Sequence, residues 1–254
     1  MPKEKVFKDE NTLEEGLANA TYHWMNYIYA CGNANIIEEH SIRYPLAEFF
    51  ERKQKADVSL EQTMEGLKYK RYDFFYQLAA KTSKNKLDGQ LSYGESQEKT
   101  NGYIEVKLLK EATSTKQEIK RFFADLVRLA IAKGVNNYFI LFGDRKCLSP
   151  NFKHFGDKKK IKAMMKDRLS GKTKEYKPFS IYSKWFAFEI NKEQVFDIDD
   201  FKAQKTFFCN SHCYDNGDPI KIDGMKIQTK LMAVAPQDDA ISPQVVYIWK
   251  VCRV

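Results

Sequence analysis

The sequence predicts an α/β protein, because helical and strand patterns alternate along one chain of 254 residues. Apolar residues recur at helical spacing in residues 12–29 and again in residues 116–133. Residues 103–109 and 137–142 are short runs rich in apolar and strand-forming side chains. The chain after residue 179 adds further segments of strand type. We therefore expect a single domain over residues 1–254, with a core of helices and mixed sheet and a C-terminal β-rich elaboration.

Residues 12–54 carry the first helical patterns. The spacing of apolar residues in 12–29 predicts one amphipathic helix. In residues 33–54, Pro45 fits either the first turn of a helix or a kink within one, so this stretch forms two helices or one bent helix. Four apolar residues of this stretch share one arc and predict a face packed on the core: Ile36, Ile37, Ala47 and Phe50.

The next part of the chain changes to strands and turns. Residues 58–81 contain strand-like segments, of which the aromatic run directly after Asp73 is the plainest. Residues 82–100 are polar, and Asp88-Gly89 and Asn101-Gly102 are typical of turns. We therefore expect an acidic residue at the start of one strand and a long polar connection to the next.

The C-terminal part, residues 179–254, has the pattern of an antiparallel β structure. Strand-like segments occupy residues 180–190, 226–234 and 244–254. Turn residues lie between them at 216–219 and 223–224. The large aromatic residues of these segments are interpreted as core residues: Trp185, Phe186, Phe188, Tyr247 and Trp249.

Composition and charge narrow the function classes. No stretch approaches the roughly 18 apolar residues of a membrane span, and the first residues lack the apolar centre of a secretion signal. The five cysteines are odd in number and scattered, which is typical of reduced thiols. The net charge of +8 favours a polyanionic partner. We therefore expect a cytoplasmic protein that binds DNA and no membrane.

Most of the net positive charge is accounted for by one basic segment, residues 151–178. It contains ten Lys and Arg against three Asp and Glu. Such a segment neutralises DNA phosphates or, alternatively, forms a solvated loop. Its candidate nucleic-acid-binding residues are Lys158, Lys159, Lys160, Lys162, Lys166 and Arg168.

The residues that predict chemistry lie in the strand of residues 103–109. Because side chains alternate along a strand, Ile104, Val106 and Leu108 share an apolar face and Glu105 and Lys107 share the other. A carboxylate can hold Mg²⁺ through oxygen, and an ammonium beside it can orient a water or offset charge on a phosphate. The alternative interpretation is a pair of solvated surface charges.

Asp73 followed by Glu105-Val106-Lys107, with a helix before and a helix and strand after, resembles the PD-(D/E)xK superfamily of restriction-endonuclease-like nucleases. The resemblance covers approximately residues 34–142. It implies a restriction-endonuclease-like core of helix, mixed sheet, helix and strand. It also implies that Asp73 and Glu105 bind Mg²⁺ or Mn²⁺ and that Lys107 serves the attacking water.

The same resemblance leaves several positions open. The leading helix of the family often adds an acid, for which Glu39 is preferred over Glu48. The proline of the motif name is replaced by Tyr72. Asp73 precedes Glu105 by 32 residues, a long connection, and Asp88, 17 residues before Glu105, is a rival metal ligand. In the helix after the motif, the resemblance points to Gln117 or Lys120 as residues that approach the phosphate.

The expected function is Mg²⁺-dependent hydrolysis of DNA phosphodiesters by a restriction or phage-defence type endonuclease. A homodimer would let two sites act on two strands. The alternative is a non-catalytic DNA-binding or regulatory module that uses residues 151–178. Cys209, His212 and Cys213 have a spacing that suggests zinc, but no second cysteine pair accompanies them, so they are interpreted as structural residues.

Overall fold

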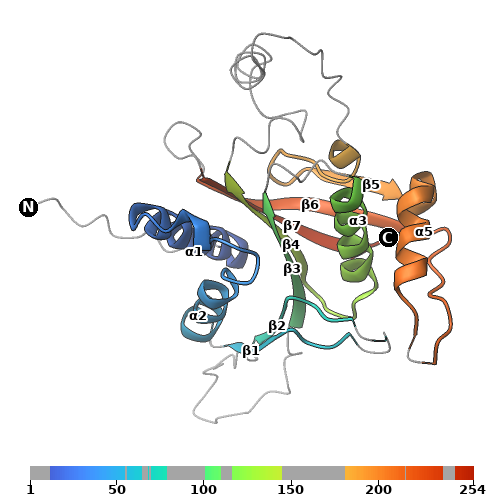
Figure 1. Cartoon of the computed structure of the whole chain (residues 1–254), viewed down its shortest axis with the longest axis horizontal. Helices are drawn as coiled ribbons and strands as arrows, with labels where there is room; N and C mark the ends of the chain where they lie inside the picture. The colour runs from blue at the N-terminus through green and yellow to red at the C-terminus, as the bar shows by residue number, and fades with distance from the viewer. Residues whose placement is uncertain are drawn as a thin grey trace, which may run out of the picture.

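The computed structural model describes residues 12–54, 56–64, 68, 70–78, 101–109, 116–144, 181–214, 216–236 and 244–254. Their strands form one seven-stranded mixed sheet in the order β1-β2-β3-β4-β7-β6-β5, so the fold is α/β. The strands are β1 (Ala56–Leu60), β2 (Phe74–Leu78), β3 (Asn101–Leu109), β4 (Asn137–Asp144), β5 (Glu193–Asp197), β6 (Lys226–Ala235) and β7 (Gln244–Arg253). Figure 1 shows this sheet between two layers of helices.

The first helical layer consists of α1 (Leu13–Ala30) and α2 (Arg43–Lys53), with the short 3₁₀ helix η1 (Ala34–Ile36) between them. α1 begins at Thr12, whose hydroxyl accepts a hydrogen bond from the Glu15 N–H at 3.1 Å. Pro45 lies in the first turn of α2, so the stretch forms separate helices rather than one bent helix. The expected core position of Ile36 is wrong: it lies in η1, and 48% of it is exposed.

The order of strand pairing places β3 in the interior of the sheet. β1, β2 and β3 are antiparallel neighbours, whereas β3 and β4 run parallel and are connected through α3 (Lys116–Ile131). β7, β6 and β5 then extend the sheet beyond β4 in antiparallel order. The second helical layer contains α3 and α5 (Lys202–Ser211), which pack against each other.

An apolar core fills each side of the sheet. On the side of α1 and α2 it includes Phe50, Phe74, Tyr76 and Ile104. On the side of α3 it includes the buried aromatic residues Trp185, Phe186, Tyr247 and Trp249, with Phe188 packed against them, as the sequence predicted. Two further short 3₁₀ helices complete this side: η4 (Ile181–Lys184) and η5 (Ile198–Phe201).

The sequence predictions were wrong in three segments. Residue 180 lies outside the described residues, and residues 181–190 do not form the predicted strand. Tyr182, Trp185 and Phe186 are all buried at helical spacing, which strand alternation does not allow. Strand β5 and helix α5 were not predicted. Asn101-Gly102 begins β3 instead of forming a turn; a Cβ on Gly102 would lie 1.8 Å from the carbonyl oxygen of Asn136, so the strand needs glycine there.

Two candidate regions, Asp88 and the basic segment 151–178, lie outside the described residues. None of the helices that the structure describes is both long and apolar enough to cross a membrane.

Candidate functional site

The site lies where β2 begins beside the middle of β3. Phe74 of β2 pairs with Ile104 of β3, so the residue before Phe74, Asp73, lies next to Glu105. The two carboxyl groups are close enough that each affects the pKa of the other. The Val106 N–H donates to Asp73 Oδ2 at 2.9 Å, which attaches the start of β2 to the centre of β3. Two acidic residues that are far apart in the sequence therefore meet at one point.

The side chains of β3 alternate as the sequence predicted. Ile104 and Val106 lie in the core under α1 and α2, while Glu105 and Lys107 face α3. The alternative of a solvated charge pair is contradicted, because Glu105 is 2% exposed. Glu105 and Lys107 also bind different partners instead of each other.

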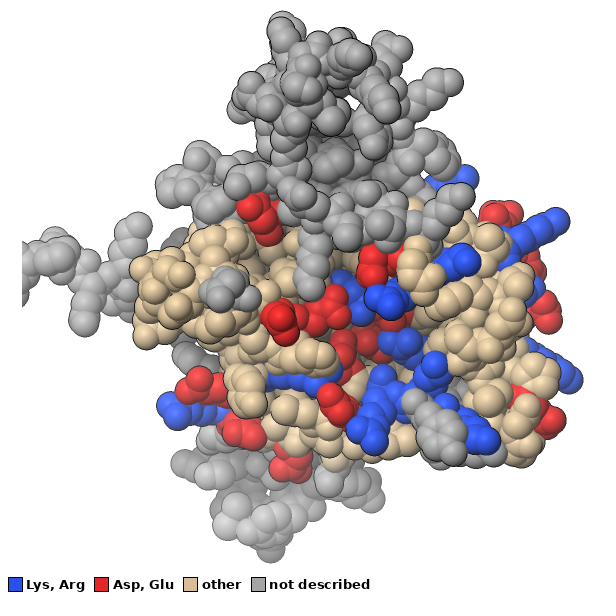
Figure 2. Space-filling model, viewed as in Figure 1, with Lys and Arg blue, Asp and Glu red and all other residues tan. Residues whose placement is uncertain are grey.

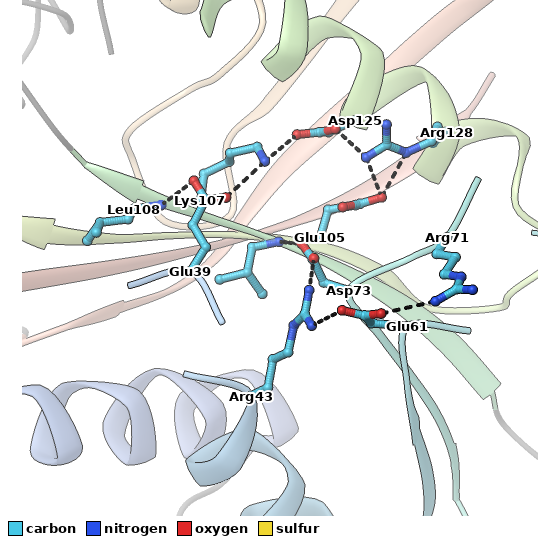
Figure 3. A network of polar contacts seen from close by, with 11 residues as sticks. Glu39, Arg43, Glu61, Arg71, Asp73, Glu105, Lys107, Leu108, Asp125 and Arg128 are labelled. Atoms are coloured by element: carbon cyan, nitrogen blue, oxygen red, sulfur yellow. Dashed lines mark hydrogen bonds and ion pairs between the residues drawn. The ribbon is translucent and has the colours of Figure 1, made fainter. Parts of the chain in front are cut away.

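Helix α3 supplies the partners of Glu105. Arg128 donates to Glu105 Oε1 from both Nε and Nη2, at 2.9 and 2.8 Å (Figure 3). One turn earlier, Asp125 accepts a short hydrogen bond from the same Nη2. Asp125 itself is 2% exposed. Glu105 is thus held by a buried arginine whose orientation is set by a second buried acid.

Asp125 also contacts Lys107, which connects the two residues of the Glu-x-Lys motif. Lys107 Nζ lies 3.1 Å from Asp125 Oδ2 and 3.4 Å from Glu39 Oε2. Glu39 lies in the turn before α2, and its other oxygen accepts from the Leu108 N–H at 3.4 Å. The lysine is therefore placed between one carboxylate from each helical layer.

A second arginine holds Asp73 from the opposite side. Arg43, in the first turn of α2, donates to Asp73 Oδ1 at 2.7 Å and to Glu61 Oε1 at 2.6 Å. Glu61 has a positive φ of 52° and also pairs with Arg71 at 3.2 Å. This arrangement fixes Asp73 between the backbone of β3 and the guanidinium of Arg43.

The two neighbouring acids have opposite pKa shifts. For Asp73, burial raises the pKa, but the charge of Lys107 and the hydrogen bonds from Val106 and Arg43 outweigh burial, and the pKa is lowered. For Glu105, burial together with the charges of Asp73 and Asp125 outweighs Arg128 and Lys107, and the pKa is raised well above its ordinary value. This split is typical of two acids that share one site.

The cations of the site remain charged. Burial lowers the pKa of Lys107, but the charges of Asp125, Glu39 and Glu105 outweigh it and the net pKa is raised. The pKa of Arg128 is raised in the same way, because Glu105 and Asp125 outweigh its burial. Lys107 is therefore an ammonium at neutral pH, suited to donate hydrogen bonds and to offset negative charge.

The donor set suits a hard divalent cation in part. Asp73 and Glu105 present carboxylate oxygens at one point, the ligand type that Mg²⁺ prefers. In the described residues, however, no group of three or more His, Cys, Asp or Glu side chains is arranged to hold a metal ion. A cation held by this pair would complete its shell with water or substrate oxygens, as Mg²⁺ commonly does.

The structure brings together Asp73, Glu105, Lys107 and Glu39 of the predicted site residues. It separates Glu48, which is exposed and pairs with Arg52 on the surface of α2. Lys120 lies over the ring of Phe207 in α5, at 5.5 Å, rather than toward the acid pair. Gln117 is exposed in the first turn of α3. Asp88 and the lysines and arginine of 151–178 lie outside the described residues.

Sequence reasoning missed Arg43, Asp125 and Arg128. A signal existed for Asp125, which lies three residues after Phe122 and four before Leu129, two buried positions of α3. A charged residue at that position of an amphipathic helix predicts a buried polar contact. Arg43 gives no such signal, because its partners lie on other elements.

His212, the histidine of the zinc-like spacing at the end of α5, is a structural residue. His212 is 3% exposed, stacks on Phe208, and contacts the Phe208 carbonyl oxygen through Nδ1 at 3.0 Å. Burial, Lys70 and Arg128 lower its pKa to about 3. His212 is therefore neutral at physiological pH.

Comparison with known proteins does not assign a family: no family model, no curated protein and no solved structure matches this chain. The function is therefore inferred from the geometry of the site.

Proposed function

We propose that this protein is a metal-dependent DNA endonuclease of the PD-(D/E)xK superfamily. The observation that carries the proposal is the placement of Asp73 beside Glu105 across β2 and β3, with Lys107 two residues along the same face. Phosphoryl transfer depends mainly on positioning and fixed charge, so a small buried set of acids and one amine is sufficient chemistry.

The order of elements around the site supports the same proposal. α2 is followed by the antiparallel strands β1, β2 and β3, then by α3 and by β4 parallel to β3. A restriction-endonuclease-like core, as the sequence resemblance implies it, would contain helix, mixed sheet, helix and strand in this order. The strands β5, β6 and β7 would then be the C-terminal elaboration of that core.

Each residue of the set has a distinct proposed role. Asp73 and Glu105 would hold Mg²⁺ or Mn²⁺, and the bound ion would offset charge on the phosphate and favour a deprotonated water. Lys107 would orient that water and offset charge rather than accept a proton, because Asp125 and Glu39 keep it protonated. Glu39 would position Lys107 through their 3.4 Å contact.

The proposed setting follows from the same inference. A nuclease with this site would be cytoplasmic, of the restriction or phage-defence type, and would act as a homodimer in which each site cleaves one strand. The basic segment 151–178 would add contacts to DNA phosphates through its lysines and Arg168.

Incubation of plasmid DNA with the purified chain and Mg²⁺ tests this function. We expect cleavage that EDTA abolishes, with discrete fragments for a sequence-specific enzyme and a smear for a non-specific one.

Lys107→Ala and Glu105→Gln should each reduce cleavage by about 10³-fold or more. Lys230→Ala and Glu193→Gln, which alter the exposed Lys230–Glu193 pair on β6 and β5, are the matched controls. Full cleavage by either site variant rejects the assignment.

The second candidate function is DNA binding without cleavage. It is favoured by Arg43 and Arg128, which already neutralise Asp73 and Glu105 and leave a network that is charge-compensated without a metal. This function predicts salt-sensitive DNA binding and intact plasmid at every Mg²⁺ and Mn²⁺ concentration. A metal-dependent cleavage product eliminates it.

A further inference from the structure

The connection between β1 and β2 is held against both α3 and the end of α5. The Tyr72 hydroxyl donates to the carbonyl oxygen of Arg128 at 3.3 Å, and the Tyr72 side chain is buried. The Lys68 N–H donates to the carbonyl oxygen of Cys213 at 3.1 Å. Within the connection, the N–H of the buried Met64 donates to the carbonyl oxygen of Lys70. These contacts fix the basic sequence Lys70-Arg71 beside the acidic site.

Arg128 has hydrogen-bonding capacity that the site does not use. Its Nε and Nη2 bind Glu105 and Asp125, whereas its Nη1 has no hydrogen-bond acceptor among the described residues. The Arg128 side chain is 15% exposed, so part of the guanidinium reaches solvent. A guanidinium with a solvent-facing N–H edge can bind a further anion.

Lys70 adds a second positive charge near that edge. Within the described part of the chain, Lys70 forms no ion pair with an acid. Its charged neighbour is Arg128, and both act on His212, which stays neutral. In Figure 2, basic side chains gather next to the acidic centre of this face, on the side toward α5. The hydrogen bond from Tyr72 to the Arg128 carbonyl holds this segment against α3, so Lys70 and Arg128 are placed to act on one anion.

We propose that Lys70 and Arg128 form a binding site for one backbone phosphate of DNA, directly beside the Asp73–Glu105 pair. This inference rests on the proposed function, since it names how the substrate of that site is held. Arg128 would then connect the acids to the DNA, with Nη2 on Glu105 and Nη1 on the phosphate. Arg71, which follows Lys70 and is 62% exposed, lies where the next phosphate contact along the strand would fall.

DNA binding without metal measures this contact separately from cleavage. A short fluorescein-labelled duplex is titrated with the full chain in EDTA, and anisotropy is followed across a series of NaCl concentrations. Loss of one phosphate contact reduces the slope of log K against log salt by about 0.9. We therefore expect Lys70→Gln to weaken binding several-fold and to lower the slope by about one. Lys70→Arg, which keeps the charge, should retain the slope of the unmodified chain.

Lys192→Gln is the matched control, because it removes the same charge next to β5, at the opposite edge of the sheet from β1 and β2. We expect its affinity and slope to equal those of the unmodified chain. An equal loss in Lys70→Gln and Lys192→Gln overturns the proposed site, since net charge alone would explain it. Unchanged binding of Lys70→Gln, or no DNA binding by the unmodified chain, overturns it as well.

Plasmid cleavage by the same preparations distinguishes this inference from the proposed function. Cleavage together with unaltered binding of Lys70→Gln refutes the phosphate site and leaves the nuclease assignment standing. Intact plasmid together with weakened binding of Lys70→Gln refutes the nuclease assignment and leaves a phosphate site in a DNA-binding protein.

Discussion

One side of β3 packs Ile104 and Val106, both fully buried, among apolar side chains of α1 and α2. The other side places Glu105, at 2% exposure, against Asp73 and Arg128. Glu105 is almost as buried as the two apolar residues, but burial stabilises only the apolar side. Transfer of charged groups from water is unfavourable, and even a well-formed buried ion pair only partly offsets that loss.

This difference indicates which side of the strand carries function. An apolar pair such as Ile104 and Val106 is explained fully by stability. A buried set of acids and bases contributes little stability, and the opposite pKa shifts of Asp73 and Glu105 are typical of functional sites. The comparison is useful because each side can be altered separately on the same strand.

Arg128→Met should have the largest effect on the free energy of unfolding. It removes the guanidinium that compensates Glu105, and breaking a buried pair on one side costs about 3–5 kcal/mol. Urea denaturation measures the loss. Glu105→Gln combined with Arg128→Met should recover part of it, because the double variant no longer buries Glu105 as an acid without its partner, and Asp125 keeps Lys107. Additive losses in the double variant would contradict direct coupling of the two residues.

Ile104→Ala alters the apolar side and should be next in size. Removal of a buried isoleucine side chain costs roughly 2–5 kcal/mol through lost burial and the cavity that remains. Since the Ile104 side chain lies on the opposite face of β3 from Glu105 and Lys107, DNA cleavage per folded molecule should be unchanged. Cleavage that falls in parallel with stability at a temperature where the variant is fully folded would show that the two sides are not separable.

His212→Asn tests how a buried histidine that stays neutral in the folded chain affects the pH dependence of stability. The pKa of His212 is about 3 in the folded chain and about 6.5 when unfolded, so only the unfolded state takes up a proton between these values. Above pH 6.5, the contribution of His212 to the free energy of unfolding does not depend on pH. As the pH falls below 6.5, protonation of the unfolded state lowers the free energy of unfolding, by roughly 2–3 kcal/mol at pH 4.5. Urea denaturation at pH 8 and pH 4.5 should give a smaller pH dependence for His212→Asn. Identical pH dependence in both proteins contradicts the lowered pKa.

The smallest effects on stability are expected at Glu48, where the Arg52 pair is exposed on α2. Glu48→Gln should lower the free energy of unfolding by less than about 0.5 kcal/mol and leave cleavage intact.

Glu39→Gln should reduce cleavage by about tenfold or more, because Lys107 loses one of its two carboxylate contacts. Comparison of the two variants in the plasmid assay separates a site residue from a surface acid of the same type. Equal activity of the two variants removes Glu39 from the site.

The local features of this site could be predicted from the sequence because they depend on period alone. A strand alternates every second residue, so the opposite placement of Val106 and Glu105 follows from their numbers. The helix of α3 and the buried strand β4 followed from apolar spacing in the same way. The segment 180–190 was misassigned because a dense aromatic run fits both a strand and a 3₁₀ turn.

The sequence by itself determined the α/β class, the two faces of β3 and the candidacy of Asp73, Glu105 and Lys107. Tertiary structure decided that Arg128 holds Glu105, that Arg43 holds Asp73, and that Glu39 rather than Glu48 reaches Lys107. Periodicity places a side chain on a face of its own element. Which distant charge it meets depends on how helices and strands pack across the sheet, and that packing is set by the whole apolar core.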